Sequence, residues 1–447
     1  MAVEASDEER HEAVAVADAA PPATEPVTEP VTEPVVEPVA ERRPGVVVGL
    51  DGLRALAALA VIAYHVQFLA RQASGPVPAA SAVGWVGVDL FFAISGFILM
   101  IPFARAHGTG ARTSLRTFYT RRARRIVPGF WLNLAILALL AGPALLLSGR
   151  GWATIAADAT FTAGYLGYPS LNAVYWSLYC EAAFYLALPF LAKAFVGRRW
   201  WWGLPAVVAL GAAFRWAVVT FVDADRFFTP IMQFPGVIDQ FAFGMVAAVL
   251  WVRVERDPDR VPGRLLLALA VAGVAGAAGL TLLIQKVLTL DGFWTASTSF
   301  GPWPLVLLRP GLSLCFALVI VGVCLRPNPV RAALDHRVVR YLGVVSFGLY
   351  LWHLPITREL GPYLGTTGGS SAGYLLRFVV VAAASVACAA VSYHLVERRF
   401  LGRREVAVNQ ARVSEDRRRP GRIFGLPRRG TTDGRRVARS TTAVPGP

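Results

Sequence analysis

An arginine and a histidine share one apolar stretch near the start of the chain. Arg54 and His65 both lie in GLDGLRALAALAVIAYHVQF, which runs from Gly49 to Phe68. On an α-helix their separation of eleven residues amounts to three turns plus about 20°, so both side chains face the same way, about 16 Å apart along the axis. A guanidinium can hold phosphate oxygens, and an imidazole can accept a proton or an acyl group. We therefore interpret this stretch as part of a functional site.

A structural explanation of the same two residues is also open. Arg54 alone could anchor the helix at the cytoplasmic headgroups, and His65 could be a hydrogen-bonded packing residue near the opposite interface. Other ionisable residues in apolar segments favour the functional interpretation, because each such group costs a few kcal/mol in hydrocarbon and normally faces a bundle interior or a wet cavity.

Several of these ionisable residues lie about as deep as the histidine of the first segment. Asp89 lies in GVDLFFAISGFIL, Glu181 in VYWSLYCEAAFYLALP and His353 in VSFGLYLWHLPI. At about 1.5 Å per residue, these side chains lie about 6 to 11 Å below the outer surface. Arg215 and Arg309 share the outer half of the membrane. We expect these residues to converge with the histidine on one polar cavity that opens outward.

A second group of basic residues lies at the inner side. Arg122 and Arg125 precede an apolar segment in TRRARRIVP, at the level of Arg54. Clustered guanidinium groups suit phosphate oxygens, because each can donate two parallel hydrogen bonds. Arg121 and Arg124 of the same run are more simply explained as topology signals.

The composition is that of a membrane protein. Of the 447 residues, 55% are hydrophobic and 16% charged, and the mean hydropathy is +0.50, which is too apolar for a soluble domain. We predict an all-α, polytopic membrane helical bundle with about ten transmembrane helices. The apolar segments lie near 48–69, 83–103, 126–147, 174–195, 200–222, 237–252, 265–285, 304–325, 341–360 and 374–396.

The charges of the loops test this count. The loops in 104–125, 193–199, 253–264 and 326–340 hold 18 Lys and Arg residues, whereas the alternate loops hold 5. The positive-inside rule therefore predicts that both termini are cytoplasmic. The stretch 152–168 is moderately apolar but holds Asp158, and an additional span there would break the alternation. We expect it to be re-entrant or interfacial.

The ends of the chain differ from the membrane region, 45–401. Residues 1–44 are acidic and contain the proline-rich repeat TEPVTEPVTEPVVEP, so we expect a disordered cytoplasmic tail. Residues 402–447 hold twelve arginines and four acidic residues, and we expect a second disordered tail near anionic lipid headgroups. A nucleic-acid partner is the less simple explanation, and we expect none. The four cysteines show no metal-ligand spacing, so no metal is expected.

Together these motifs resemble the acyltransferase-3 family of integral membrane O-acyltransferases. The resemblance covers roughly Gly49 to Phe400 and depends on the order of several short motifs more than on any single one. They are Arg54 with His65, the GVDLFF-SG segment from Gly87 to Gly96, Arg122 with Arg125, the segment of Trp176, Ser177 and Glu181, the segment of Tyr350, Trp352 and His353, and the closing segment of Tyr393 and Glu397.

The resemblance implies transfer of an acyl group, expected to be acetyl, from cytoplasmic acyl-CoA to a hydroxyl of a carbohydrate, glycolipid or secondary-metabolite acceptor at the bacterial plasma membrane. No permanently bound cofactor is expected. Some members add an extracellular hydrolase-like domain, which we do not expect here. The predicted catalytic residues are His65 and Glu181, and the predicted donor-binding residues are Arg54, Arg122 and Arg125. The predicted substrate-binding residues are Asp89, Trp176, Arg309, Tyr350 and His353.

A transporter or flippase for a polysaccharide or a lipid-linked sugar is the alternative, since it would also hold buried ionisable residues. The sequence shows no internal repeat of a transporter type and no pair of broken spans. The enzyme is therefore the favoured interpretation. The sequence leaves open whether His65 is a general base or a transient acyl carrier.

Overall fold

A computed structural model describes most of the chain from Val47 onward. The described residues are 47–70, 75–197, 200–223, 228–255, 257, 260–289, 306–364 and 370–402. These residues are mostly helical and include no strand, which agrees with the predicted all-α class. The predicted tail 1–44, and the predicted tail 402–447 apart from Gly402, lie outside the described residues.

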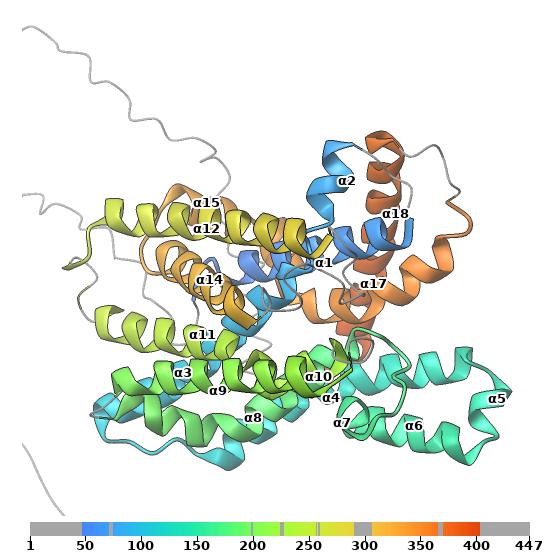
Figure 1. Cartoon of the computed structure of the whole chain (residues 1–447), viewed down its shortest axis with the longest axis horizontal. Helices are drawn as coiled ribbons and strands as arrows, with labels where there is room; N and C mark the ends of the chain where they lie inside the picture. The colour runs from blue at the N-terminus through green and yellow to red at the C-terminus, as the bar shows by residue number, and fades with distance from the viewer. Residues whose placement is uncertain are drawn as a thin grey trace, which may run out of the picture. The chain divides into compact units, whose positions relative to one another are not determined.

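Each of the ten predicted apolar segments overlaps one of the longer helices (Figure 1). These helices are α1 (Leu50–Ala70), α3 (Val86–Thr109), α4 (Leu115–Leu140), α8 (Tyr175–Val196), α9 (Trp200–Phe221), α11 (Phe234–Glu255), α12 (Gly263–Thr289), α14 (Arg309–Cys324), α17 (Ser346–Leu360) and α18 (Ser371–Ser392). The shorter helices are α2 (Pro76–Ser81), α5 (Pro143–Leu146), α6 (Gly149–Ala159), α7 (Ala163–Leu166), α10 (Phe228–Ile231), α15 (Pro329–Leu334), α16 (Arg337–Val344), the π-helix η2 (Tyr393–Glu397) and α19 (Arg398–Phe400).

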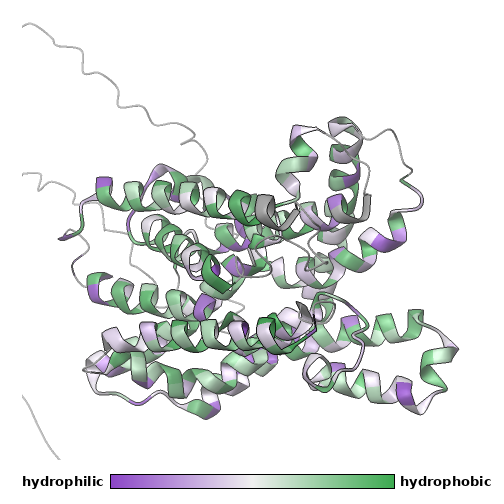
Figure 2. Ribbon diagram, viewed as in Figure 1, coloured by the Kyte–Doolittle hydropathy of each residue, from purple (hydrophilic) through white to green (hydrophobic). Residues whose placement is uncertain are grey.

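The protein is a polytopic helical membrane protein. Within the described residues, seven helical stretches are long and apolar enough to cross a membrane. Hydrophobic residues dominate the long helices (Figure 2), and large apolar side chains such as Phe190, Phe221 and Leu376 are exposed, as a lipid-facing surface requires. α14 and α17 have 16 and 15 residues, fewer than the roughly 20 of a straight crossing. The number of ten spans stays a prediction.

The prediction of the third segment, 126–147, was wrong at both ends. α4 already begins at Leu115, where the Ser114 side chain accepts a hydrogen bond from the backbone N–H of Thr117. It ends before Gly142, which has φ 81°, a conformation that favours glycine. Hydropathy misses the first part because that part is rich in arginine, although arginine is a good helix former.

The segment after this break is too short to span a membrane. α6 has 11 residues and rises about 16 Å, roughly half of a hydrocarbon core. Its C-terminal region is held by Asp158, whose carboxylate accepts hydrogen bonds from the Tyr179 hydroxyl and from the backbone N–H of Leu171. This agrees with the expectation that 152–168 does not cross.

The helices α3 and α11 pack closely against each other. A Cβ added at Gly96 would lie 2.1 Å from the carbonyl oxygen of Phe241, and one added at Gly244 would lie 2.0 Å from that of Ala93. Glycine at these two positions therefore lets the backbones approach closely. α11 also contacts α8, α9 and α14, so it forms the centre of one side of the bundle core.

Contacts between helix ends group the loops as the charge pattern predicted. Arg105 near the end of α3 forms an ion pair with Glu255 at the end of α11, and Arg326 donates to the carbonyl oxygen of Val261 before α12. All of these residues belong to the predicted cytoplasmic side. At the opposite ends, the Tyr374 hydroxyl of α18 donates to a backbone carbonyl near the end of α1.

Candidate active site

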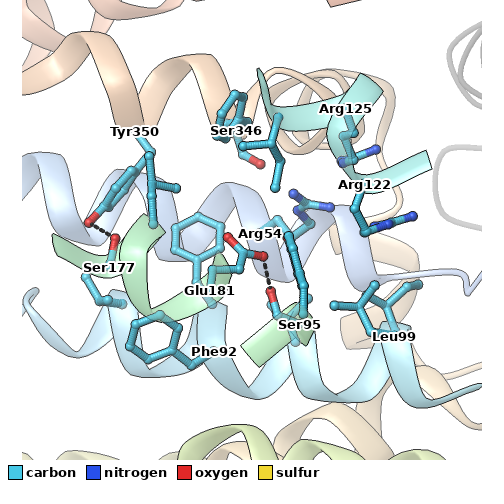
Figure 3. Close-up of a pocket in the computed structure, with 18 residues that line it drawn as sticks. Arg54, Phe92, Ser95, Leu99, Arg122, Arg125, Ser177, Glu181, Ser346 and Tyr350 are labelled. Carbon is cyan, nitrogen blue, oxygen red and sulfur yellow. Dashed lines mark hydrogen bonds between the residues drawn. The ribbon is translucent and has the colours of Figure 1, made fainter. Parts of the chain in front are cut away.

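A cavity lies between α1, α3, α4, α8 and α17 (Figure 3). It has about 740 Å³ of empty space, part of it open to solvent. At one end it is lined by Arg54 of α1 and by Arg122 and Arg125 of α4. The two α4 arginines are three residues apart and so share one face of the helix. The three predicted donor-binding residues thus meet in one place, which we call the arginine cavity, and together they suit a ligand with several anionic oxygens.

Three uncharged or acidic groups line the middle of the arginine cavity. The Ser95 hydroxyl donates a hydrogen bond of 2.8 Å to Oε1 of Glu181. Ser346, the first residue of α17, also lines the cavity. Its side chain is 0% exposed, and its hydroxyl has no hydrogen-bond partner among the described residues. Because a buried hydroxyl without a partner costs about 1 to 3 kcal/mol, Ser346 is well suited to bind a polar ligand atom.

The other end of the arginine cavity is lined by Ser177 of α8 and Tyr350 of α17. The Tyr350 hydroxyl lies 2.7 Å from Oγ of Ser177 and 3.1 Å from the carbonyl oxygen of Val174. Both side chains are buried. This network fixes the Tyr350 ring between the cavity and the next turn of α17.

On that next turn of α17, His353 contacts His65 of α1. Nε2 of His353 lies 3.2 Å from Nδ1 of His65, and the ring centroids are 5.0 Å apart. His353 is completely buried, whereas His65 is half-buried. The two helices therefore present two imidazoles to each other one helical turn beyond Tyr350, which lines the end of the arginine cavity.

The hydrogen bonds to backbone carbonyls determine the tautomers of the two neutral rings. Nδ1 of His353 lies 2.8 Å from the carbonyl oxygen of Tyr350, and Nδ1 of His65 lies 2.9 Å from that of Val61. A carbonyl oxygen only accepts, so each Nδ1 carries its hydrogen. Nε2 of His353 is then the acceptor that faces His65. The free lone pair of His65 is therefore on its Nε2, which is the nitrogen available for chemistry.

We expected the outer polar residues to meet in one cavity. In the structure they do not. Glu181 lies in the arginine cavity and bonds to Ser95. Among the described residues, the hydrogen bonds of the His65 ring go to Val61 and His353, so Glu181 does not orient this imidazole. The reason is geometric: Ser177 is level with Tyr350, and Glu181 lies four residues, about 6 Å, further along α8 toward the arginines.

Two other predicted residues bind each other. Nη2 of Arg309 lies 3.3 Å from Oδ1 of Asp89, and both side chains are 2% exposed. A similar buried pair joins Arg215 and Asp239, with two hydrogen bonds of 3.0 Å. These pairs connect α14 with α3 and α9 with α11. In this geometry the charges of Asp89 and Arg309 compensate each other within the helix packing.

The remaining predicted residue, Trp176, does not line the arginine cavity. Its ring packs edge-on against Phe92, with the centroids 6.0 Å apart. Sequence reasoning missed Ser95, Ser346 and Tyr185, which all line the cavity. Ser95 lies in the second-span motif, and the spacing of Glu181 and Tyr185 by four residues was a further signal for the face of α8.

A comparison with known proteins shows the family of the chain. The family profile described as an acyltransferase domain matches residues 47–394, which is most of the chain. The chain belongs to the acyltransferase-3 family.

Family relatives come from several bacteria. The peptidoglycan O-acetyltransferase OatA of Listeria monocytogenes is 27% identical over 78% of this chain and 55% of its own length. YrhL of Bacillus subtilis is 28% identical over 79% of this chain and 54% of its own length. The acyltransferase MdmB of Streptomyces mycarofaciens is 30% identical over 78% of this chain and 87% of its own length.

The chain thus spans about half the length of the first two relatives. No solved structure matches the chain.

Proposed function

We propose that this acyltransferase uses cytoplasmic acyl-CoA to acylate a carbohydrate hydroxyl at the bacterial plasma membrane. One observation carries the proposal: the arginine cavity runs from three guanidinium groups to Tyr350, and the next turn of α17 presents His353 to His65. A donor with a phosphate group at one end and a reactive thioester at the other matches this sequence of groups.

The arginines bind the diphosphate of the donor. Arg54, Arg122 and Arg125 come from two helices and face one space, so their forks can hold phosphate oxygens from more than one side. All three lie at the predicted cytoplasmic side, where acyl-CoA is available. The diphosphate therefore enters the bundle less deeply than the pantetheine arm and the thioester.

The pantetheine arm extends from the arginines toward Tyr350. It carries two amides, and the cavity offers the Glu181 carboxylate, together with the hydroxyls of Ser95 and Ser346. Glu181 can accept from an amide N–H, and the Ser346 hydroxyl, which has no hydrogen-bond partner among the described residues, can donate to an amide oxygen. Apolar side chains such as Phe91 and Ile98 line the same space and exclude water from the arm.

His65 activates the acceptor hydroxyl. Its Nε2 takes the hydroxyl proton while the oxygen attacks the thioester carbonyl, and the resulting imidazolium returns the proton to the departing CoA thiolate. Transient acylation of the same nitrogen is the other route, and it requires the same tautomer. His353 acts as a positioning residue, because its Nε2 holds the Nδ1–H of His65.

We propose a glycan of the cell envelope as the acceptor. Support comes from a relative, since OatA of Listeria monocytogenes is a peptidoglycan O-acetyltransferase. Glycolipid and secondary-metabolite acceptors are the alternatives that the same test separates.

The test uses the purified full-length chain in proteoliposomes with acetyl-labelled acetyl-CoA and, in separate samples, peptidoglycan fragments, a glycolipid or a hydroxylated secondary metabolite as the acceptor. We expect CoA release together with labelled ester on the glycan. His65→Gln should reduce the rate about 10² to 10⁴-fold while CoA binding stays normal. A transporter would release no CoA, and an active His65→Gln protein would remove His65 from the mechanism.

A further inference from the structure

A second hollow adjoins the arginine cavity and has no role in the mechanism above. It has about 620 Å³ of empty space and lies between the second half of α3 and the start of α4. Ile98, Leu99 and Arg122 line both spaces. The two spaces are therefore neighbours that meet at one of the proposed diphosphate-binding arginines. We call the second one the α3–α4 groove.

The lining of the α3–α4 groove combines apolar and polar groups. Pro102 and Phe118 contribute apolar surface, whereas Thr113 and Thr117 contribute hydroxyls. Arg121 adds a guanidinium group and is exposed to solvent. A ligand with a flat apolar ring, polar groups on the ring edge and a phosphate group fits this lining. The ring can pack on the apolar surface, the polar groups can bind the hydroxyls, and the phosphate can bind the guanidinium group.

The order of residues along α3 and α4 shows on which side of the arginine cavity the α3–α4 groove lies. On α4, Thr117 and Arg121 precede Arg125, so the groove lies farther from the histidines than the arginine cavity does. On α3, Pro102 follows Ser95 by about two turns in the same direction. In the proposed function, the diphosphate of the donor binds at Arg122 and the pantetheine arm extends toward Tyr350. The part of the donor on the other side of the diphosphate must therefore lie on the side of the α3–α4 groove.

We infer that the α3–α4 groove binds the 3′-phosphoadenosine part of acyl-CoA, with Arg121 holding the 3′-phosphate. This inference rests on the proposed function, since it assigns a binding site to the end of the donor that the arginine cavity does not hold. It gives Arg121 a role that the sequence analysis had not favoured. Arg124 is exposed on the same helix and lines neither space, so it provides a matched control.

The first experiment compares binding of CoA and 3′-dephospho-CoA to the purified full-length chain in a neutral detergent. One charge-assisted hydrogen bond at a partly exposed site should give a preference for CoA of about tenfold. Arg121→Gln should weaken CoA binding about tenfold and leave 3′-dephospho-CoA binding unchanged, so that the preference disappears. Arg124→Gln should keep the wild-type preference.

The second experiment fills the groove. Thr117→Trp should weaken binding of CoA and of 3′-dephospho-CoA alike, because the indole would occupy the space of the adenine ring. Binding of 4′-phosphopantetheine, which has no nucleoside, should not change. Thr120→Trp is the control, since Thr120 is exposed and lines neither space.

The outcomes separate this inference from the proposed function. If the wild type binds no CoA, both are wrong. If CoA binds and Arg121→Gln keeps the preference over 3′-dephospho-CoA, the inference alone is wrong. A variant that loses affinity for both ligands equally would also overturn it, because Arg121 would then serve the helix or an anionic lipid headgroup and not the 3′-phosphate. Competition by phosphatidylglycerol vesicles identifies the lipid case.

Discussion

His65 and His353, whose imidazole rings are in contact, have different roles. The Nδ1–H of His353 is engaged by the carbonyl oxygen of Tyr350, so its Nε2 is the atom that can accept from His65. His65 in turn keeps its Nε2 free. The buried member of the pair therefore orients the half-buried one, and only the latter is placed to meet an acceptor.

We predict that His353→Gln retains more activity than His353→Leu. Glutamine can place an acceptor oxygen near the position of Nε2, whereas leucine leaves the Nδ1–H of His65 with only its backbone partner. The Leu variant should lose about 10² in kcat with little change in KM for the donor. Turnover per folded molecule is the measurement, with thermal stability as the control. Equal activity of the two variants would contradict a positioning role.

Ser346 gives a second prediction, in which stability and binding change in opposite directions. Ser346→Ala removes a completely buried hydroxyl that has no partner among the described residues, so the ligand-free protein should be as stable as the wild type or more stable, by up to about 1 kcal/mol. The same change should raise the KM for acetyl-CoA about three- to tenfold, because the donor loses a hydrogen bond.

Thermal unfolding without ligand and donor titration check the two halves of this prediction. Ser385 serves as the control, because its hydroxyl is also buried and without a partner among the described residues but does not line the arginine cavity. Ser385→Ala should leave the KM unchanged. A lower stability of Ser346→Ala would show that the hydroxyl already has a partner within the protein.

At the scale of helices, the site depends on how closely α3 and α11 approach. α3 supplies Ser95 and Ile98 to the arginine cavity, and its neighbour Gly96 packs directly against the backbone of Phe241. Ser95 and Gly96 point to different sides of the same helix. The helix contact is thus one of the features that hold the cavity wall in place.

We predict that Gly96→Ala and Gly244→Ala destabilise the protein. A Cβ at either position would lie about 2 Å from a backbone carbonyl oxygen, so the helices must separate, at a cost of about 1 to 3 kcal/mol or more. Gly279→Ala in α12 is the matched control, since nothing lies within 4 Å of its added Cβ. Its stability should stay the same or increase by up to about 1 kcal/mol. Thermal unfolding in detergent measures all three, and an unchanged Gly96→Ala protein would disprove the close contact.

Hydropathy and motif order predicted the helices and the family, but not which side chains meet. Depth below the surface can be counted along a segment, and on this basis Glu181, His65 and His353 seemed equivalent. Tertiary packing determines which helices are neighbours and how far they are shifted along their axes. No single segment encodes this packing. The arginine cluster could be predicted because its residues are close in sequence or at one membrane surface, whereas Ser346 shows no signal in hydropathy.

The whole molecule has a consistent sidedness. Arg105 pairs with Glu255, and Arg326 bonds to the carbonyl of Val261, so these contacts join loops of the Arg-rich set to one another. The arginine cavity has its guanidinium groups at the same side. The positive-inside rule therefore predicts that the proposed donor-binding end faces the cytoplasm and that the histidine pair lies in the outer half of the membrane.

The last prediction tests this orientation in cells. Reporter fusions after Arg112, Arg264 and Arg337 should all show a cytoplasmic location, because the loops around them hold most of the basic residues. Fusions after Tyr168 and Tyr363 should show the opposite location.

The fusion after Tyr168 is the most informative, since α6 is too short to cross. If it reads cytoplasmic, the segment 152–168 crosses after all. If two of the three Arg fusions read external, the donor arginines face the side without acyl-CoA, and the proposed direction of transfer is wrong.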